Sequence, residues 1–206
     1  MEKLFLFDFD GVIVDSLEFY EEVARLYSEE IGRTIARDRE EFMDLYDDNF
    51  YVSIRKRGFD LEALGRAAKT VAPRLDHTTI EAFEECFPVI EKLAGDHILL
   101  IVSSNSRRTI ELILSKYSCI ECFREILGAD FMYSKVKKIR HAMEKWRKTP
   151  EETYFIGDTT GDIREAKAAG VRTVAVTWGW HSRSRLETAH PDHIIETPAE
   201  LLALGE

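Results

Sequence analysis

The fold of this chain is predicted outward from residues 4 to 16, which run Leu-Phe-Leu-Phe-Asp-Phe-Asp-Gly-Val-Ile-Val-Asp-Ser. The apolar run from Leu4 to Phe7 is continuous rather than alternating, which predicts a strand buried on both faces, as in a parallel sheet. Asp8 and Asp10 then lie at its carboxyl end, where open parallel sheets bind their ligands. Because two neighbouring carboxylates repel each other unless a cation lies beside them, the pattern indicates a divalent metal site.

Composition limits the class of protein. The 206 residues suffice for one α/β domain with a modest insertion, and 45% hydrophobic content supports a packed core. The balance of 28 basic and 38 acidic residues gives a net charge of −10, which disfavours nucleic acid and anionic membranes as partners. No apolar run approaches ~20 residues and no signal-peptide pattern precedes the first strand. We therefore expect a cytoplasmic protein, either a monomer or a homodimer.

The cysteines and histidines receive no functional role. Cys86, Cys119 and Cys122 are odd in number and form no paired framework. Cys119 and Cys122 have the spacing of half a zinc site, but no second Cys or His pair stands at a matching distance. His181 and His190 likewise lack metal-ligand spacing.

An all-helical segment follows the first motif. Apolar residues recur at helical spacing from Leu17 to Ile31, and Gly32 ends that pattern. Asp15 or Ser16 can cap this helix, and Glu18 completes a capping-box pattern with Asp15. Three more helices are expected over about 38–46, 50–57 and 61–71, and residues 17–80 contain no pattern typical of a buried strand.

The chain then returns to an α/β pattern with polar residues at strand ends. A strand over 98–102 leads into Ser103-Ser104-Asn105-Ser106, where hydroxyls and helix-start amides can bind anionic oxygen. After a strand near 125–128, Lys135 stands at the head of a helix. A short strand over 153–156 runs into Gly157-Asp158-Thr159-Thr160-Gly161-Asp162 and a helix over 163–169. Strands over 172–177 and 193–196 complete the sheet.

These four motifs, in this order and covering essentially the whole chain, resemble those of the haloacid dehalogenase superfamily, in particular its phosphoglycolate-phosphatase-like branch. The resemblance implies an α/β fold: a Rossmann-like three-layer core with a mostly parallel sheet, plus an inserted all-α cap of the C1 type. Residues 1–16 and 81–206 would form the catalytic core and residues 17–80 the cap.

The resemblance also implies a site. It assigns catalysis to Asp8, Asp10 and Lys135, phosphate binding to Ser104, Asn105 and Gly11, and Mg²⁺ binding to Asp8, Asp10, Asp158 and Asp162. In this scheme Asp10 binds metal through its backbone carbonyl, and Asp162 acts through water or by orienting Lys135. Mg²⁺ prefers such oxygen ligands.

Several assignments stay open. Ser103 is the alternative to Ser104, and Lys137 and Lys138 are the alternatives to Lys135. The basic run 55–57, Arg-Lys-Arg, would contact a second anionic group on the substrate or form a solvated helix face.

The aromatic residues near the motifs are equally open. Tyr20 and Tyr46 are possible substrate contacts, although the spacing of Tyr20 places it in the cap core. The run Trp178-Gly179-Trp180-His181 would wall the site or simply pack as a loop.

The expected function is a Mg²⁺-dependent phosphatase that hydrolyses a small phosphorylated metabolite, a phosphate monoester, through an aspartyl-phosphate on Asp8. Asp10 would act as general acid and then general base. The alternatives are a sugar-phosphate mutase of the same superfamily, a 2-haloacid dehalogenase and a non-catalytic phosphate-binding protein. The dehalogenases that this chain resembles generally lack the second aspartate, which disfavours that alternative.

Overall fold

The computed structural model describes residues 1–117 and 119–206. Its main sheet has six strands in the order β5-β4-β1-β6-β7-β8, and every neighbouring pair is parallel. The strands are β1 (Leu4–Phe7), β4 (Ile98–Val102), β5 (Glu125–Leu127), β6 (Thr153–Gly157), β7 (Arg172–Val176) and β8 (His193–Ile195). The strand order reverses direction at β1, so the carboxyl ends of β4, β1 and β6 flank the switch point where such sheets bind ligands.

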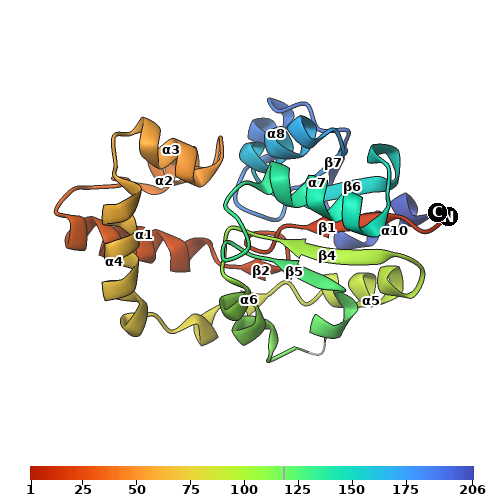
Figure 1. Ribbon diagram of the computed structural model, residues 1–206, viewed down its shortest axis with the longest axis horizontal. Coiled ribbons are helices and arrows are strands. Elements are labelled where there is room, and N and C mark those ends of the chain that lie inside the picture. The colour runs from red at the N-terminus through yellow and green to blue at the C-terminus, as the bar shows by residue number, and fades with distance from the viewer. Residues whose placement is uncertain (118) are drawn as a thin grey trace.

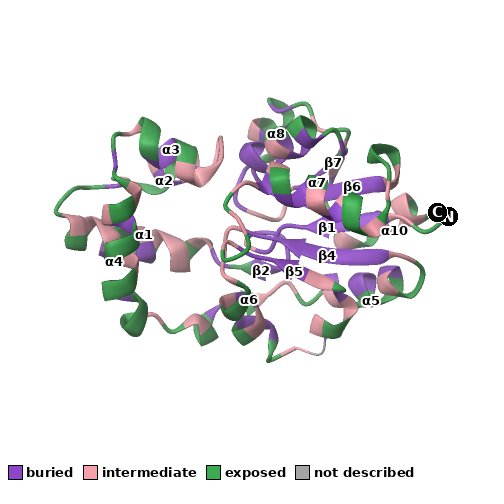
Figure 2. Ribbon diagram, viewed as in Figure 1, coloured by how far each residue is buried: buried purple, intermediate pink, exposed green. Residues whose placement is uncertain are grey.

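Helices cover both faces of this sheet, which confirms the three-layer α/β prediction (Figure 1). Alternate residues of β1 point to opposite faces: Phe5 and Phe7 join one apolar cluster, whereas Leu4 and Leu6 join another. The face with Phe5 and Phe7 is covered by three helices, α5 (Cys86–Asp96), α6 (Arg107–Leu114) and α10 (Leu201–Gly205). The face with Leu4 and Leu6 is covered by α7 (Lys135–Trp146) and α8 (Thr160–Ala169). Helix α9 (Arg183–Glu187) packs beside α8. Figure 2 shows the central strands fully buried between these layers.

The inserted segment folds as four helices that stand apart from the sheet (Figure 1). They are α1 (Leu17–Ile31), α2 (Arg39–Asp44), α3 (Phe50–Lys56) and α4 (Leu61–Val71), followed by short 3₁₀ turns at Ala72–Arg74 and His77–Thr79. Phe42, Leu45 and Ile54 are among the buried residues of their shared apolar cluster. The all-helical insert is therefore confirmed.

A short antiparallel ribbon joins the two segments that connect the insert to the sheet domain. β2 (Val14–Asp15) pairs with β3 (Glu81–Ala82), with Val14 opposite Ala82 and Asp15 opposite Glu81. Two-residue strands are too short to show a period of alternation, so the sequence did not predict this ribbon. Both chain termini lie at the opposite end of the sheet from the insert (Figure 1).

Two local predictions were wrong. The capping box at Asp15 does not form, because Ser16 is the N-cap residue of α1 and its hydroxyl donates instead to Asp10 Oδ1, 2.8 Å away. Helix α8 begins at Thr160 rather than residue 163, because Thr159 and Asp162 form a reciprocal capping box at its start.

The three cysteines are free thiols, as their count and spacing predicted. Within residues 1–117 and 119–206, no helix is both long enough and apolar enough to cross a membrane.

Candidate active site

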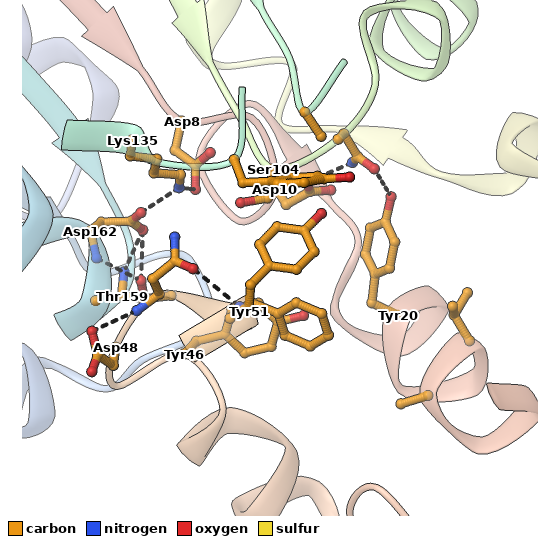
Figure 3. A pocket seen from close by; sticks show the side chains of 18 of the residues that line it. Asp8, Asp10, Tyr20, Tyr46, Asp48, Tyr51, Ser104, Lys135, Thr159 and Asp162 are labelled. Atoms are coloured by element: carbon orange, nitrogen blue, oxygen red, sulfur yellow. Dashed lines mark hydrogen bonds and ion pairs between the residues drawn. The ribbon is translucent and has the colours of Figure 1, made fainter. Parts of the chain in front are cut away.

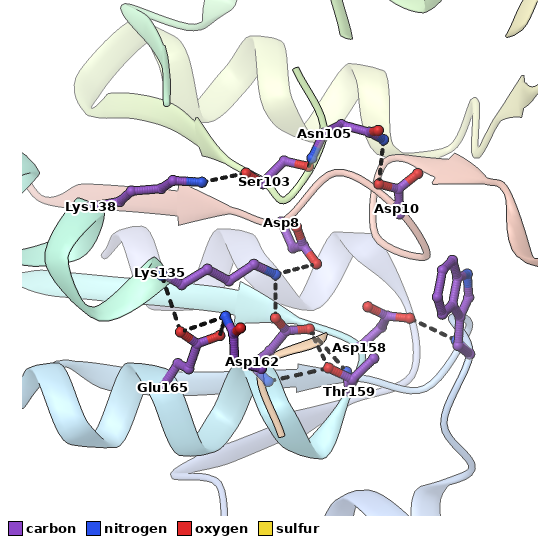
Figure 4. Close-up of polar contacts among 12 residues, drawn as sticks. Asp8, Asp10, Ser103, Asn105, Lys135, Lys138, Asp158, Thr159, Asp162 and Glu165 are labelled. Carbon is purple, nitrogen blue, oxygen red and sulfur yellow. Dashed lines mark hydrogen bonds and ion pairs between the residues drawn. The ribbon is translucent and has the colours of Figure 1, made fainter. Parts of the chain in front are cut away.

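The predicted motif residues converge at the carboxyl edge of the sheet. Asp8 directly follows β1, Ser103 follows β4, and Asp158 follows β6 (Figure 4). The Asp8 amide donates to the carbonyl of Ile156 at 2.8 Å, so the first aspartate still belongs to the parallel ladder. Its position is therefore fixed by the central strand rather than by a mobile loop.

Lys135 is the lysine that the structure brings to the aspartates. Its ammonium lies 2.8 Å from Asp8 Oδ2 and also bonds Asp162 Oδ1. Burial acts to lower the pKa of Lys135, but the charges of Asp162 and Asp8 outweigh it and hold that pKa above its ordinary value. Of the rival lysines, Lys137 is exposed, whereas Lys138 is buried and donates to the Ser103 carbonyl at 2.5 Å.

Three buried carboxylates form a group that suits a divalent cation. One oxygen each from Asp8, Asp158 and Asp162 lies within 4.8 Å of the other two. Burial raises the pKa of both Asp8 and Asp158, and the neighbouring Asp162 charge raises each further. Carboxylates crowded in this way hold protons unless a cation replaces them.

The oxygens of Asp158 meet the requirement of such a cation. Its Oδ2 accepts a hydrogen bond from the Trp180 amide at 2.8 Å, whereas its buried Oδ1 has no hydrogen-bond partner among the described residues. A buried carboxylate oxygen without a donor is costly, and a hard cation with oxygen ligands would satisfy it. The residues present therefore fit Mg²⁺.

Asp162 is instead occupied by protein partners. Its Oδ1 accepts from Lys135, and its Oδ2 accepts from the hydroxyl and the amide of Thr159, at 2.7 and 3.2 Å. This arrangement favours the role of orienting Lys135 over direct metal binding.

The Asp10 carboxylate does not belong to the group formed by Asp8, Asp158 and Asp162 and has its own hydrogen-bond partners. Its Oδ1 accepts from the Ser16 hydroxyl at 2.8 Å and its Oδ2 from the Asn105 side-chain amide at 2.7 Å. Burial raises the pKa of Asp10 to about 6, against the lowering effect of these hydrogen bonds and of Lys135. A pKa in this range suits a group that both gives and takes a proton near neutral pH.

Asn105 also connects the site to the insert. The hydroxyl of Tyr20, on α1, donates to Asn105 Oδ1 at 2.7 Å (Figure 3). Tyr20 therefore reaches the site, and it also packs against the apolar cluster of the insert, as its helical spacing predicted. Next to Asn105, Ser104 lines the cavity. Ser103 is fully buried, and its hydroxyl oxygen accepts a hydrogen bond from the backbone amide of Asn105 at 3.0 Å.

Gly11 stands where a side chain would not fit. Its φ is +73°, and a Cβ built on it would lie 2.0 Å from Asp158 Oδ2 and 2.9 Å from the Trp180 ring. Its amide already donates to the Val14 carbonyl at 2.8 Å. The structure thus gives Gly11 a place beneath Asp158 rather than a phosphate-binding amide, which corrects the prediction.

A cavity of about 470 Å³ lies over these groups, between the sheet edge and the insert. Tyr46 and Trp180 both line it, so the loop after β7 does help to wall the site. The basic run 55–57 does not line the cavity: Lys56 pairs with the lining residue Asp48 at 2.6 Å, and Arg57 donates to backbone carbonyls of the insert.

Sequence reasoning missed the residues that dock the insert on α8. Glu165 accepts from the Lys135 amide at 3.1 Å and from the Asn49 side chain. The Gly161 amide donates to the Tyr46 carbonyl at 2.9 Å. The Asn49–Glu165 and Tyr46–Gly161 contacts join residues more than a hundred positions apart, and no local pattern in the sequence predicts them.

This fold and these converging carboxylates define a hydrolase-type site at the switch point of an α/β sheet. The model of the haloacid dehalogenase-like hydrolase family matches residues 5–176, and the chain belongs to that family.

Two groups of curated relatives match the sequence. The phosphoglycolate phosphatase of Synechococcus elongatus is 29% identical over 210 residues, spanning 96% of this chain and 94% of that protein. Pyrophosphatase PpaX of Oceanobacillus iheyensis is 30% identical over 129 residues, spanning 61% of this chain and 60% of that protein.

Solved structures share the fold over the whole chain. A haloacid dehalogenase-like family hydrolase from Streptococcus pneumoniae superimposes with a TM-score of 0.81 at 21% identity, covering 100% of this chain and 99% of that one. A predicted phosphatase from Clostridium acetobutylicum gives 0.84 at 20% identity, covering 99% and 98%.

Proposed function

We propose that this protein is a Mg²⁺-dependent phosphatase that hydrolyses small phosphate monoesters through an aspartyl-phosphate formed on Asp8. The observation that carries the proposal is the Lys135 ammonium, 2.8 Å from Asp8 in a buried group that also holds Asp158 and Asp162. The family membership and the phosphatase names of the relatives support the same reaction class.

Asp8 is the nucleophile in this scheme. Its carboxylate oxygen forms a bond to phosphorus while the bond from phosphorus to the ester oxygen breaks. Lys135 favours the ionised form of Asp8 and offsets negative charge on the transferred group. Asp162 holds Lys135 in place for both tasks.

Asp10 moves the protons. It donates one to the leaving ester oxygen, and then accepts one from the water that attacks the phosphorus of the aspartyl-phosphate. That second step releases inorganic phosphate and restores Asp8. The hydrogen bonds from Ser16 and Asn105 fix the Asp10 carboxylate for these transfers.

The remaining groups bind the phosphoryl oxygens and the metal. Ser104, which lines the cavity, and Asn105 would contact the phosphoryl group, with the buried Ser103 as the alternative hydroxyl. Asp8, Asp158 and the Asp10 carbonyl would hold Mg²⁺. When bound, Mg²⁺ neutralises charge on the phosphoryl oxygens.

The domain division belongs to the same proposal. Residues 17–80 would act as a cap, and residues 1–16 and 81–206 as the catalytic core. The β2–β3 ribbon ties the two crossings together at this boundary. A cap over the carboxylates excludes bulk water while the phosphoryl group is transferred.

The test is phosphate release from p-nitrophenyl phosphate and a panel of small esters, with Mg²⁺ or with EDTA. We expect turnover that requires the metal and falls at least about 1,000-fold in Asp8→Asn, because the nucleophile is lost. Undiminished turnover in Asp8→Asn, or no release from any ester by folded wild-type protein, would contradict the proposal.

A further inference from the structure

Carboxylates outnumber cationic groups among the side chains that line the cavity. Among the residues that the structure describes, seven lining side chains are carboxylates and one, Lys135, is a cation. That cation is already bonded to Asp8 and Asp162 at the phosphoryl end. The part of the cavity that receives the rest of the substrate therefore offers no positive charge.

The insert contributes an apolar, aromatic wall. Of its fifteen lining residues, Asp48 is the charged one and Asn49 the polar amide; the others are tyrosines, phenylalanine, aliphatic residues and a glycine. The Tyr51 and Tyr133 rings meet across the gap between insert and core, with centroids 4.6 Å apart. Tyr46 and Tyr51 line the same cavity as Asp10 and Ser104 (Figure 3).

Two basic side chains of the insert, Lys56 and Arg57, do not line the cavity and already have partners. Lys56 is exposed and paired with Asp48, and Arg57 donates to the carbonyls of Ile35 and Glu41 at 3.2 and 3.1 Å. A carboxylate or second phosphate on the substrate would thus enter a site of like charge without a partner, which is unfavourable in a partly desolvated cavity.

We infer that the preferred substrates are phosphate monoesters whose alcohol half is uncharged and apolar, with an aromatic or comparably bulky group. This inference rests on the proposed phosphatase function and names its substrate class. A cavity of about 470 Å³ has room for a ring beyond the phosphoryl group. Esters with a second anionic group, such as phosphoglycolate, and pyrophosphate itself are then poor substrates of this protein.

Benzyl phosphate and 2-phosphoglycolate give a matched comparison, because both are esters of a primary alcohol and differ in carrying a phenyl or a carboxylate group. We expect kcat/KM for benzyl phosphate to exceed that for 2-phosphoglycolate, pyrophosphate and O-phosphoethanolamine by at least about tenfold. Equal or better use of an anionic or cationic compound would overturn the inference while leaving the phosphatase proposal intact. Turnover of none would overturn both.

A charge introduced into the wall provides a second test. Gly65 lies on α4 and lines the cavity, and a Cβ built there meets nothing within 4 Å. Gly65→Arg should therefore fold and should raise the ratio of kcat/KM for 2-phosphoglycolate over benzyl phosphate about tenfold. Thr70→Arg adds the same charge at an exposed position of α4 outside the lining and should keep the wild-type ratio. An unchanged ratio in folded Gly65→Arg would overturn the inference.

Discussion

The Asp10 carboxylate is positioned by a chain of hydrogen bonds that starts in the insert. The Tyr20 hydroxyl donates to Asn105, and the Asn105 side chain donates in turn to Asp10. The second oxygen of Asp10 is held by Ser16, the residue just before α1. Docking of the insert and orientation of the proposed acid and base are therefore physically connected.

Tyr20→Phe tests this connection. Loss of the hydroxyl should lower kcat about fivefold to tenfold, the worth of one hydrogen bond, without unfolding the protein. The Asn105 hydrogen bond lowers the pKa of Asp10, so loosening it should move the pH profile of kcat to higher pH, whether Asp10 acts as acid or as base in the slower step. If Tyr20 acts through Asn105, the double variant with Asn105→Ala should be no slower than Asn105→Ala alone. Additive losses would contradict this.

Lys135→Met removes the cation shared by two buried carboxylates. We expect a loss of activity of at least about 100-fold, because charge stabilisation at the transferred group is lost. The free energy of unfolding at neutral pH should also fall by about 3 kcal/mol, since Asp8 and Asp162 remain buried without their partner. Phosphate release and urea unfolding measure the two effects. Lys137→Met, at an exposed position of the same helix, should change neither, and equal losses in both variants would contradict the assignment.

At the scale of single residues, the sequence predicted positions better than partners. Lys135 was chosen over its neighbours because the apolar pattern fixed where α7 begins. The spacing of Tyr20 correctly placed it on a helix face, but spacing cannot tell whether that face meets its own domain or another. Gly11 was predicted in the right turn and given the wrong role, since the neighbour beneath it, Asp158, comes from a distant strand.

At the scale of elements, two loops pack against Asp158, one of the three carboxylates that suit a metal ion. Gly11 follows β1, and Gly179 follows β7; a Cβ built at Gly179 would lie 2.3 Å from the Cβ of Asp158 and 2.4 Å from the Gly11 carbonyl oxygen. Both loops therefore approach Asp158 more closely than a side chain permits. Close backbone approach to a ligand site is a typical use of glycine.

Gly11→Ala and Gly170→Ala form a matched pair for this packing. Both glycines have positive φ, +73° and +92°, but a Cβ at Gly170 meets nothing within 4 Å. Gly170→Ala should cost about 1 kcal/mol of unfolding free energy from backbone strain alone. Gly11→Ala should cost about 3 kcal/mol and abolish stabilisation by Mg²⁺, because Asp158 must move. Urea unfolding with and without Mg²⁺ measures both, and equal costs would refute the packing role.

Element boundaries were predictable where the sequence carries a periodic pattern with a local stop signal. Strand β4 and helix α4 were predicted to the residue, and α1 ends at Gly32 in a left-handed conformation as expected. The start of α8 differs from the prediction because Thr159 and Asp162 form a capping box, and Asp162 also belongs to the acidic motif, so one residue has two roles there.

At the scale of the whole molecule, the insert is held on the core by contacts remote from the proposed chemistry. Arg185 on α9 reaches Asp44 at 2.6 Å and Asp47 at 2.8 Å. Asp47 also accepts from the Thr160 hydroxyl at 2.7 Å. The sequence predicted two separate bodies from their different periodicities, but not this docking, since its partners are far apart in the chain and each alone is an ordinary surface residue.

His181 lies at this junction and predicts how stability changes with pH. Its Nδ1 accepts from the Thr160 amide at 3.1 Å, so the neutral ring carries its proton on Nε2, 3.1 Å from the Met43 carbonyl of the insert. Burial, assisted by Arg185, lowers the pKa of His181 to about 4. Between about pH 6.5 and 4 the unfolded chain then binds one more proton than the folded chain. The contribution of His181 to stability is therefore full above about pH 6.5 and decreases as the pH falls.

Urea unfolding in EDTA measures this effect. From pH 7.5 to 5.0 the free energy of unfolding of the wild type should fall by about 2 kcal/mol more than that of His181→Gln, which does not titrate. Other groups titrate in both proteins and cancel in the comparison; parallel pH profiles would mean that His181 is not held neutral at the junction.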